Sequence, residues 1–154
     1  MEADRRRYAA VVGPARCGEE LATLTYEVGR GLAEAGFTVV TGGEGGAMEA
    51  ASRGAREGGG TVVGVLPGTD RSRANVHADI TVATGVGHAR NLGVVASADV
   101  VVAVGGEWGT LSEIALARKL DRPVVTLSGR PLEGVHDAAT AEEAVELILE
   151  LIDG

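Results

Sequence analysis

The chain contains one kind of turn twice, as VVTGGEGGAMEAA at residues 39–51 and as VAVGGEWGTLSEI at residues 102–114. In each segment an apolar run ends in Gly-Gly-Glu, one further residue and Gly, and a helical pattern begins directly afterwards. A buried strand that passes through a glycine turn into a helix is typical of βαβ units. The two segments therefore predict an α/β fold with a doubly wound, Rossmann-like parallel sheet.

Short β-branched runs alternate with helical patterns along the rest of the chain. They predict about six strands, at residues 8–12, 37–41, 61–66, 79–83, 99–104 and 123–127. Helices are expected on both faces of the sheet, at residues 19–35, 46–57, 87–97, 109–120 and 141–152. Residues 67–78 form the longest irregular stretch and are a candidate lid. Because no linker is apparent, residues 1–154 are expected to form one domain.

Composition limits the kinds of partner that this chain can have. The 154 residues carry a net charge of −8, which opposes binding to nucleic acid and to anionic membranes. No apolar stretch is long enough to span a bilayer, and a single cysteine, Cys17, fits a reducing compartment. We therefore expect a cytoplasmic protein whose ligand is a small molecule, with Cys17 as an unreactive loop thiol.

The two glycine turns predict a binding site for an anion. A turn at a helix N-terminus leaves backbone N–H groups free to bind a phosphate, and glycine lets the ligand approach the backbone. The expected ligand is nucleotide-like. The residues expected to bind it are Gly42, Gly43, Gly45, Gly46, Gly105, Gly106, Gly109 and Thr110. The acidic third positions, Glu44 and Glu107, would repel a phosphate unless the side chain points away or a cation bridges the carboxylate and the phosphate.

The turn after the first strand narrows the class of nucleotide site. Its sequence, GPARCG at residues 13–18, has neither the GxGxxG dinucleotide pattern nor the GK[ST] ending of a P-loop. Ordinary NAD enzymes and P-loop NTPases are therefore disfavoured.

Two charged residues are candidates for chemistry. Glu113 lies on an apolar stripe of its helix, where it either completes a capping box with Thr110 or faces the ligand as an ionised carboxylate. Arg90 opens the helix after the fourth strand and either lies on the surface or brings its guanidinium to an anion at the same sheet edge. The histidines show no metal-ligand spacing, so no metal site is predicted. Among them, His88 is a further site candidate because it lies two residues before Arg90.

These motifs resemble the Lonely Guy family, whose typical members carry PGGxGTxxE and an upstream Arg-Lys pair. The resemblance rests on VGGEWGTLSE from Val104, VTGGEGGAME from Val40 and ARN at residues 89–91, and it extends over about residues 8–127. Members of that family hydrolyse the N-glycosidic bond of nucleoside 5′-monophosphates. The resemblance implies that Glu113 and Arg90 are catalytic, and that Asn91 lies at the ligand. It also implies that neither a metal nor a redox cofactor is needed, and that the protein is a homodimer or higher homo-oligomer.

The chain also departs from the Lonely Guy pattern. Gly105 stands where that family has Pro, Glu107 replaces its second Gly, and Asn91 replaces its Lys. With these departures, the chain resembles a bacterial Rossmann-type branch of the family, which includes molybdenum cofactor carrier proteins. Lysine decarboxylation, a label often given to such relatives, is rejected because Lys119 is the only lysine and its position on the helix is away from Glu113.

Three functions therefore stay open at this point. The first is hydrolysis of nucleoside 5′-monophosphates, which passes through an oxocarbenium-like ribose that Glu113 would stabilise. The second is a non-catalytic carrier or sensor of a nucleotide-like or pterin-like ligand. The third is an assembly module whose pocket is vestigial.

Overall fold

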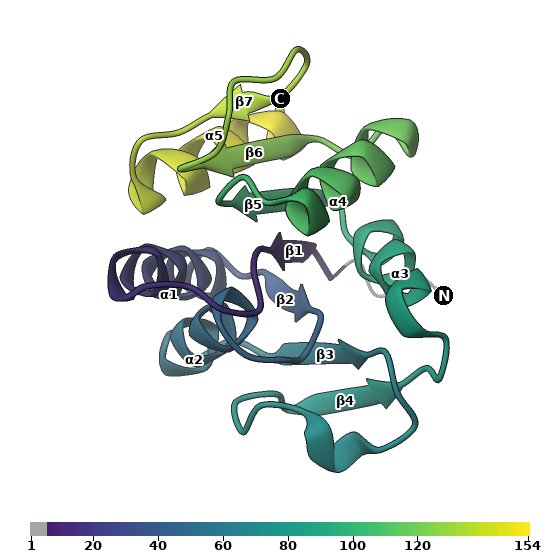
Figure 1. The fold of residues 1–154 in the computed structure, drawn as a ribbon. Helices are drawn as coiled ribbons and strands as arrows, with labels where there is room; N and C mark the ends of the chain where they lie inside the picture. Colours follow the sequence, from purple (N-terminus) through teal and green to yellow (C-terminus); the bar gives the residue numbers. More distant parts are fainter. Residues whose placement is uncertain (1–5) are drawn as a thin grey trace, which may run out of the picture.

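The computed structural model describes residues 6–154 and contains one sheet of seven parallel strands (Figure 1). The strand order is β4-β3-β2-β1-β5-β6-β7. Their bounds are β1 Tyr8–Val12, β2 Thr38–Thr41, β3 Val62–Leu66, β4 Ile80–Ala83, β5 Val100–Val104, β6 Val124–Leu127 and β7 His136–Asp137. The doubly wound α/β prediction is confirmed.

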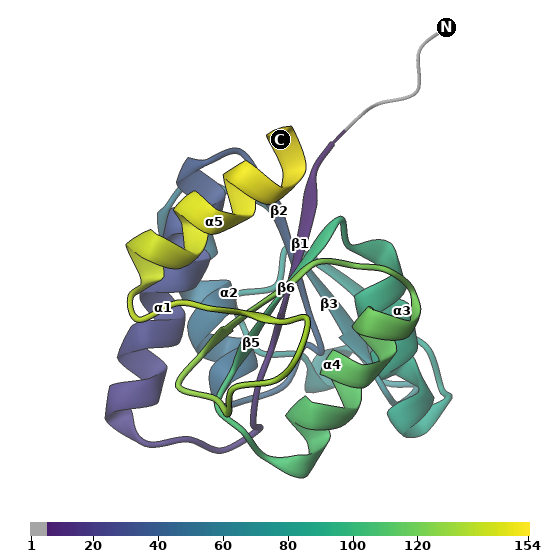
Figure 2. The same cartoon turned by 90° about the horizontal axis from the view of Figure 1, so that it is seen from above.

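Helices cover both faces of the sheet (Figure 2). One face carries α1, α2 and α5, and the opposite face carries α3 and α4. Their bounds are α1 Glu19–Glu34, α2 Ala47–Glu57, α3 Arg90–Ser97, α4 Trp108–Lys119 and α5 Ala141–Asp153, with short 3-10 helices at Arg71–Arg73 and Gly87–Ala89. Within residues 6–154, no helix combines the length and the apolar character that crossing a bilayer demands.

The six predicted strands are all present, and each differs from its predicted bounds by at most one residue. The seventh strand, β7, was missed because it has only two residues, both exposed, and no apolar run to mark it. The predicted helix at residues 87–97 begins as a 3-10 turn and becomes α-helical at Arg90. At the start of α5, the backbone N–H of Glu143 donates to Thr140 Oγ1 at 3.1 Å, so Thr140 caps this helix.

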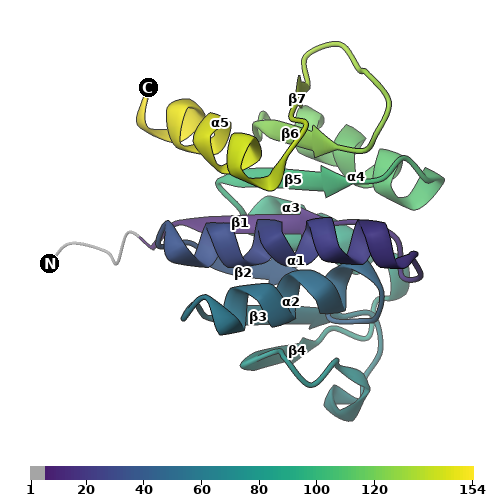
Figure 3. The ribbon, with the colours of Figure 1, turned by 90° about the vertical axis from the view of Figure 1, so that its left-hand side faces the viewer.

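The core is built from small aliphatic side chains in two layers, one on each side of the sheet. Every residue of the inner strand β5 is buried, as expected for a strand covered by helices on both faces. The helices α1 and α2 lie side by side on one face (Figure 3) and approach closely at glycines. A Cβ on Gly54 would come within 2.0 Å of the carbonyl oxygen of Tyr26.

The order of the strands places a crevice at one edge of the sheet. After β1 the chain winds outward through β2, β3 and β4, and it then returns to the other side of β1 as β5. The turns that follow β1 and β5 therefore lead to helices on opposite faces of the sheet, which leaves a crevice between them. Doubly wound proteins bind their ligands at this switch point. The turns that follow β1, β2 and β5 all meet at this edge.

Candidate functional site

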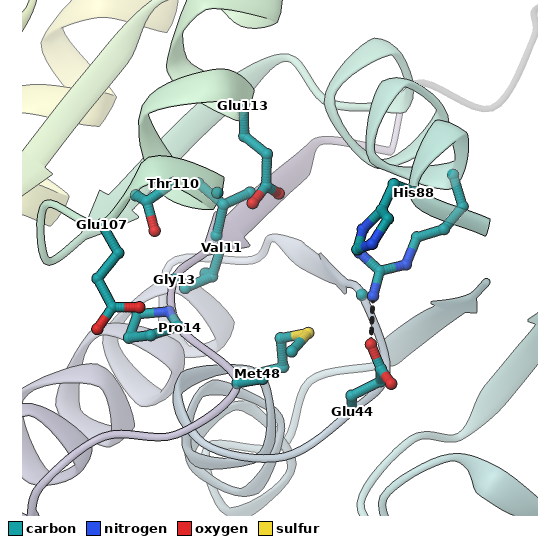
Figure 4. A pocket seen from close by; sticks show the side chains of 14 residues that line it. Val11, Gly13, Pro14, Glu44, Met48, His88, Glu107, Thr110 and Glu113 are labelled. Atoms are coloured by element: carbon teal, nitrogen blue, oxygen red, sulfur yellow. Dashed lines mark hydrogen bonds and ion pairs between the residues drawn. The ribbon is translucent and has the colours of Figure 1, made fainter.

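A cavity of about 180 Å³ opens at the switch point, between the two glycine turns and the turn after β1 (Figure 4). It receives residues from both of the repeated turns, so the two segments that share a layout in sequence also share one site in space. The lining consists of Val11, Val12, Gly13, Pro14, Ala15, Gly42, Glu44, Met48, His88, Arg90, Glu107, Gly109, Thr110 and Glu113.

Arg90 is a buried arginine at the start of α3, with 8% of its surface exposed. Its guanidinium lies against the backbone of Gly42, where a Cβ would come within 2.8 Å of Nη1. Nη2 donates to Glu44 Oε1 at 2.5 Å, and Nη1 donates to Asn91 Oδ1. The third donor, Nε, is buried without a hydrogen-bond partner in the described part of the chain. The surface alternative for Arg90 is therefore wrong.

Glu113 lies in the second turn of α4 with 9% of its surface exposed, and its carboxyl group points into the cavity (Figure 4). Burial raises the pKa of this carboxyl from 4.5 to about 7, against the opposing effect of the nearby Arg90 charge. The capping-box alternative is wrong, because the N-cap of α4 is Glu107 and Thr110 already lies inside the helix. The pKa of Glu113 therefore lies close to neutral pH.

Thr110 has its hydroxyl in the cavity wall. The residue is 2% exposed, and Oγ1 has no hydrogen-bond partner in the part of the chain that the structure describes. No side chain caps the N-terminus of α4, so the first backbone N–H groups of that helix are also left for a ligand or water. Buried polar atoms in folded proteins are nearly always hydrogen-bonded. Arg90 Nε and Thr110 Oγ1 therefore mark places where a bound molecule would supply the missing partners.

The acidic third positions of the two turns have different environments. Glu44 forms an ion pair with Arg90. The arginine neutralises the carboxylate, so Glu44 no longer repels an anion as its sequence position alone suggested. Glu107 is exposed at the N-cap of α4, where negative charge is favourable. Burial, and secondarily the charge of Glu107, raise the pKa of Cys17, which keeps this loop thiol protonated and unreactive.

The predicted glycines divide into those that line the cavity and those that shape its turns. Gly42 and Gly109 line it. Gly43 and Gly46 have φ values of +76° and +61°, which only glycine adopts readily, and they build the first turn. Two other predicted ligand-binding residues, Gly45 and Gly106, also lie outside the lining.

Gly105 and Asn91 were predicted to bind the ligand, but neither lines the cavity. Gly105 has a φ of +77°, which a proline cannot adopt, so the departure from the Lonely Guy pattern at this position changes the backbone. Gly105 borders a separate open groove beside α1. Asn91 does not line the cavity and instead accepts a hydrogen bond from Arg90.

Several lining residues were not predicted as ligand contacts. The turn after β1 supplies Gly13 and Pro14, and α2 supplies Met48. At Gly13 a Cβ would come within 2.5 Å of Val104 Cγ2, so the close packing of β1 and β5 is what demands glycine there. The position of GPARCG at the end of the first strand was the available signal. The candidate His88 does line the cavity.

The candidate lid is fastened to the first glycine turn. The backbone N–H of Asn75 donates to the carbonyl of Gly43 at 2.8 Å, and its side-chain amide donates to the carbonyl of Glu44 at 3.0 Å. Residues 67–78 therefore brace the turn that carries Glu44.

Fold and site together define a doubly wound α/β protein with a cavity at its switch point, walled by a helix N-terminus and a buried arginine. A model of the SLOG cluster4 family matches residues 6–150, and the chain belongs to that family. An uncharacterized protein of Archaeoglobus fulgidus is 44% identical over 136 residues, which cover 88% of this chain and 89% of that protein.

Two solved structures are similar over nearly their whole length. The molybdenum cofactor binding protein of Rippkaea orientalis has a TM-score of 0.92 and 35% identity, with 97% of this chain and 99% of that chain covered. The molybdenum cofactor carrier protein of Chlamydomonas reinhardtii has a TM-score of 0.90 and 36% identity, with 97% and 100% covered.

Proposed function

We propose that this protein binds a small phosphorylated heterocyclic ligand in the switch-point cavity and carries it without turnover. The molybdenum cofactor, a phosphorylated pterin, is the favoured cargo. The observation that carries this proposal is the pair of buried atoms without partners, Arg90 Nε and Thr110 Oγ1, in the wall of one cavity. Each lacks the partner that an anionic, hydrogen-bonding ligand supplies.

The phosphate of such a ligand fits best at the N-terminus of α4. The backbone N–H groups there carry partial positive charge, and the Thr110 hydroxyl adds a donor. Arg90 Nε would bind a further oxygen of the same phosphate. The cavity of about 180 Å³ is smaller than a typical site for a whole drug-sized molecule, so the remainder of the ligand extends over the mouth.

Two facts favour carriage over hydrolysis. Burial raises the pKa of Glu113 to about 7, so its carboxyl group is not held in the ionised form that stabilises an oxocarbenium-like ribose. In addition, two similar structures at 35% and 36% identity are described as a molybdenum cofactor binding protein and a molybdenum cofactor carrier protein.

The test uses molybdenum cofactor released from a donor molybdoenzyme. The purified protein is mixed with it and passed through a gel-filtration column, and molybdenum and pterin fluorescence are measured in the protein peak. We expect both to co-elute with wild-type protein and to be much reduced for Arg90→Ala and Thr110→Val. Failure of the folded wild-type protein to retain either would overturn the proposal.

Hydrolysis of nucleoside 5′-monophosphates is the second candidate. It is favoured by one observation, that Glu113 and Arg90, the residues matching the Lonely Guy motifs, line the same cavity. In this reaction water replaces the base at C1′, and Glu113 would stabilise the positive charge that develops on the ribose. Chromatography of AMP incubated with the protein tests it: adenine must appear with wild type and be lost with Glu113→Gln.

Three further expectations stay predictions: a single domain over residues 1–154, a homo-oligomer, and a cytoplasmic location. One cooperative transition in calorimetry is the expected result for the first. Light scattering at several protein concentrations measures the subunit number, and cell fractionation tests the location.

A further inference from the structure

We propose that Glu44 is a specificity-determining residue, which holds one donor of Arg90 and so admits only an oxyanion that spans two donors of that guanidinium. This inference rests on the proposed function, since it assumes that an anionic ligand enters the cavity. It assigns a role to the acidic third position of the first glycine turn.

The contacts of the guanidinium define what a ligand can gain. Nε and Nη2 lie on one side of an arginine and form a fork for two oxygens. Glu44 accepts a hydrogen bond from Nη2 at 2.5 Å, while Nε has no partner in the described chain. Glu44 therefore satisfies half of the fork. A phosphate or another oxyanion with two suitable oxygens would satisfy both halves and displace the carboxylate, whereas a halide ion would not.

The two partners differ in freedom. The side chain of Arg90 is 9% exposed, and it is held by Asn91 and by its packing against Gly42. The side chain of Glu44 is 43% exposed, and its carboxylate has no hydrogen-bond partner besides Arg90 within residues 6–154. When a ligand competes, Glu44 can therefore rotate into solvent while Arg90 keeps its place.

The backbone beneath Glu44 does not need to move in this exchange. Asn75 binds the carbonyl groups of both Gly43 and Glu44, at 2.8 Å and 3.0 Å. The displacement is then a change of side-chain rotamer on a fixed turn. Glu44 thus competes with the ligand for Arg90. A ligand binds only if its hydrogen bonds to Arg90 are stronger than the one that Glu44 makes.

The experiment compares wild type with Glu44→Gln and with Glu49→Gln. The control residue Glu49 is an exposed carboxylate on α2, just beyond the same turn, so its substitution makes the same change in net charge. AMP and inorganic phosphate are titrated by calorimetry at low chloride and at 0.3 M chloride, an ionic strength of roughly twice the physiological value. Circular dichroism establishes that each variant is folded.

We expect Glu44→Gln to bind AMP and phosphate about fivefold more tightly than wild type at low chloride, because a half-exposed ion pair no longer competes. Chloride should weaken binding to this variant more than binding to wild type, and Glu49→Gln should behave as wild type. Unchanged or weaker binding by folded Glu44→Gln would overturn the inference and leave the ligand site intact. Absence of binding by all three proteins would instead contradict the anion-binding site on which the proposed function depends.

Glu44→Ala provides the second measurement if Glu44→Gln is not folded. Alanine removes the competing carboxylate without leaving an amide that could hydrogen-bond Arg90. The same gain in affinity is expected, and its absence counts against the inference in the same way.

Discussion

The guanidinium of Arg90 packs directly against the backbone of Gly42, which leaves no room for a Cβ on that residue. Such an atom would lie 2.8 Å from Arg90 Nη1 and 2.7 Å from Met48 Sδ. Both neighbours are the ends of flexible side chains, so Gly42→Ala should fold while Arg90 is displaced. We expect at least about tenfold weaker AMP binding, measured by calorimetry, since an arginine held 1 Å away loses its aligned hydrogen bonds.

Gly93→Ala is the matched control for this substitution. Gly93 lies in α3, three residues after Arg90, and a Cβ there meets nothing within 4 Å. Alanine favours helix, so this variant should bind normally and be slightly more stable. Equal affinity of Gly42→Ala and wild type would show that the position of Arg90 does not matter for the ligand.

Replacing Arg90 by lysine tests the fork itself. Lysine keeps the positive charge but offers one compact ammonium instead of two parallel donors. We expect AMP affinity to fall about tenfold for Arg90→Lys and further for Arg90→Ala. Arg30→Ala, which breaks an exposed pair with Glu34 on α1, provides the control for loss of charge. An Arg90→Lys variant with wild-type affinity would count against bidentate binding.

The raised pKa of Glu113 predicts that the stability of the protein depends on pH. Its folded-state pKa of about 7 lies above the ordinary value of 4.5, so the folded state retains a proton that the unfolded state has lost. Ionisation of the buried Glu113 carboxyl lowers the free energy of unfolding. This loss of stability is absent below pH 4.5, grows between pH 4.5 and 7, and is complete above pH 7. It is at most about 3 kcal/mol.

Glu113→Gln removes this titration. The variant should therefore unfold at a higher temperature than wild type at pH 8, with a smaller difference at pH 5. Glu27→Gln, at an exposed position of α1, should show no such trend. Thermal unfolding followed by circular dichroism at both pH values makes the comparison, and an equal difference at the two would contradict the prediction.

Thr110→Val separates stability from binding. Valine has the shape of threonine but lacks the hydroxyl, which is buried without a partner in the described chain. Removing an unsatisfied polar group should raise stability by up to about 1 kcal/mol. AMP affinity should fall about fivefold because a donor to the ligand is lost. A variant that loses stability and keeps its affinity would assign the hydroxyl to the fold.

Close helix packing gives a prediction about the fold alone. At Gly54 an added Cβ would collide with backbone, 2.0 Å from the carbonyl oxygen of Tyr26. Backbone cannot move aside as a flexible side chain can, so Gly54→Ala should lower the free energy of unfolding by roughly 2 kcal/mol or more. Urea denaturation measures this, with Gly93→Ala again as the control.

Most strands could be predicted because the signal for each is local. Runs such as VVVAV in β5 are buried on both faces and bounded by turns, whereas the two exposed residues of β7 have no comparable pattern. The position of Glu113, Arg90 and Gly42 at one sheet edge also followed from the sequence, since carboxyl ends of parallel strands share an edge.

What the sequence could not reveal is which side chains pair across the turns. Glu44 and Arg90 are 46 residues apart, and only the folded sheet brings them to 2.5 Å. The TLSE pattern allowed a capping box with Thr110 as the N-cap, but the N-cap of α4 is Glu107, three residues earlier. Whether a turn glycine lines the cavity or only bends the chain is likewise decided by three-dimensional placement.

The switch point has a mechanical consequence. Strands β2 to β4 extend to one side of β1, and β5 to β7 extend to the other. Arg90, at the start of the helix that follows β4, belongs to the first half, and Thr110 belongs to the second. A molecule that binds both residues acts as a tether between the halves, so the protein should separate from its cargo before the sheet comes apart. Unloading would then precede unfolding along any path that opens this seam.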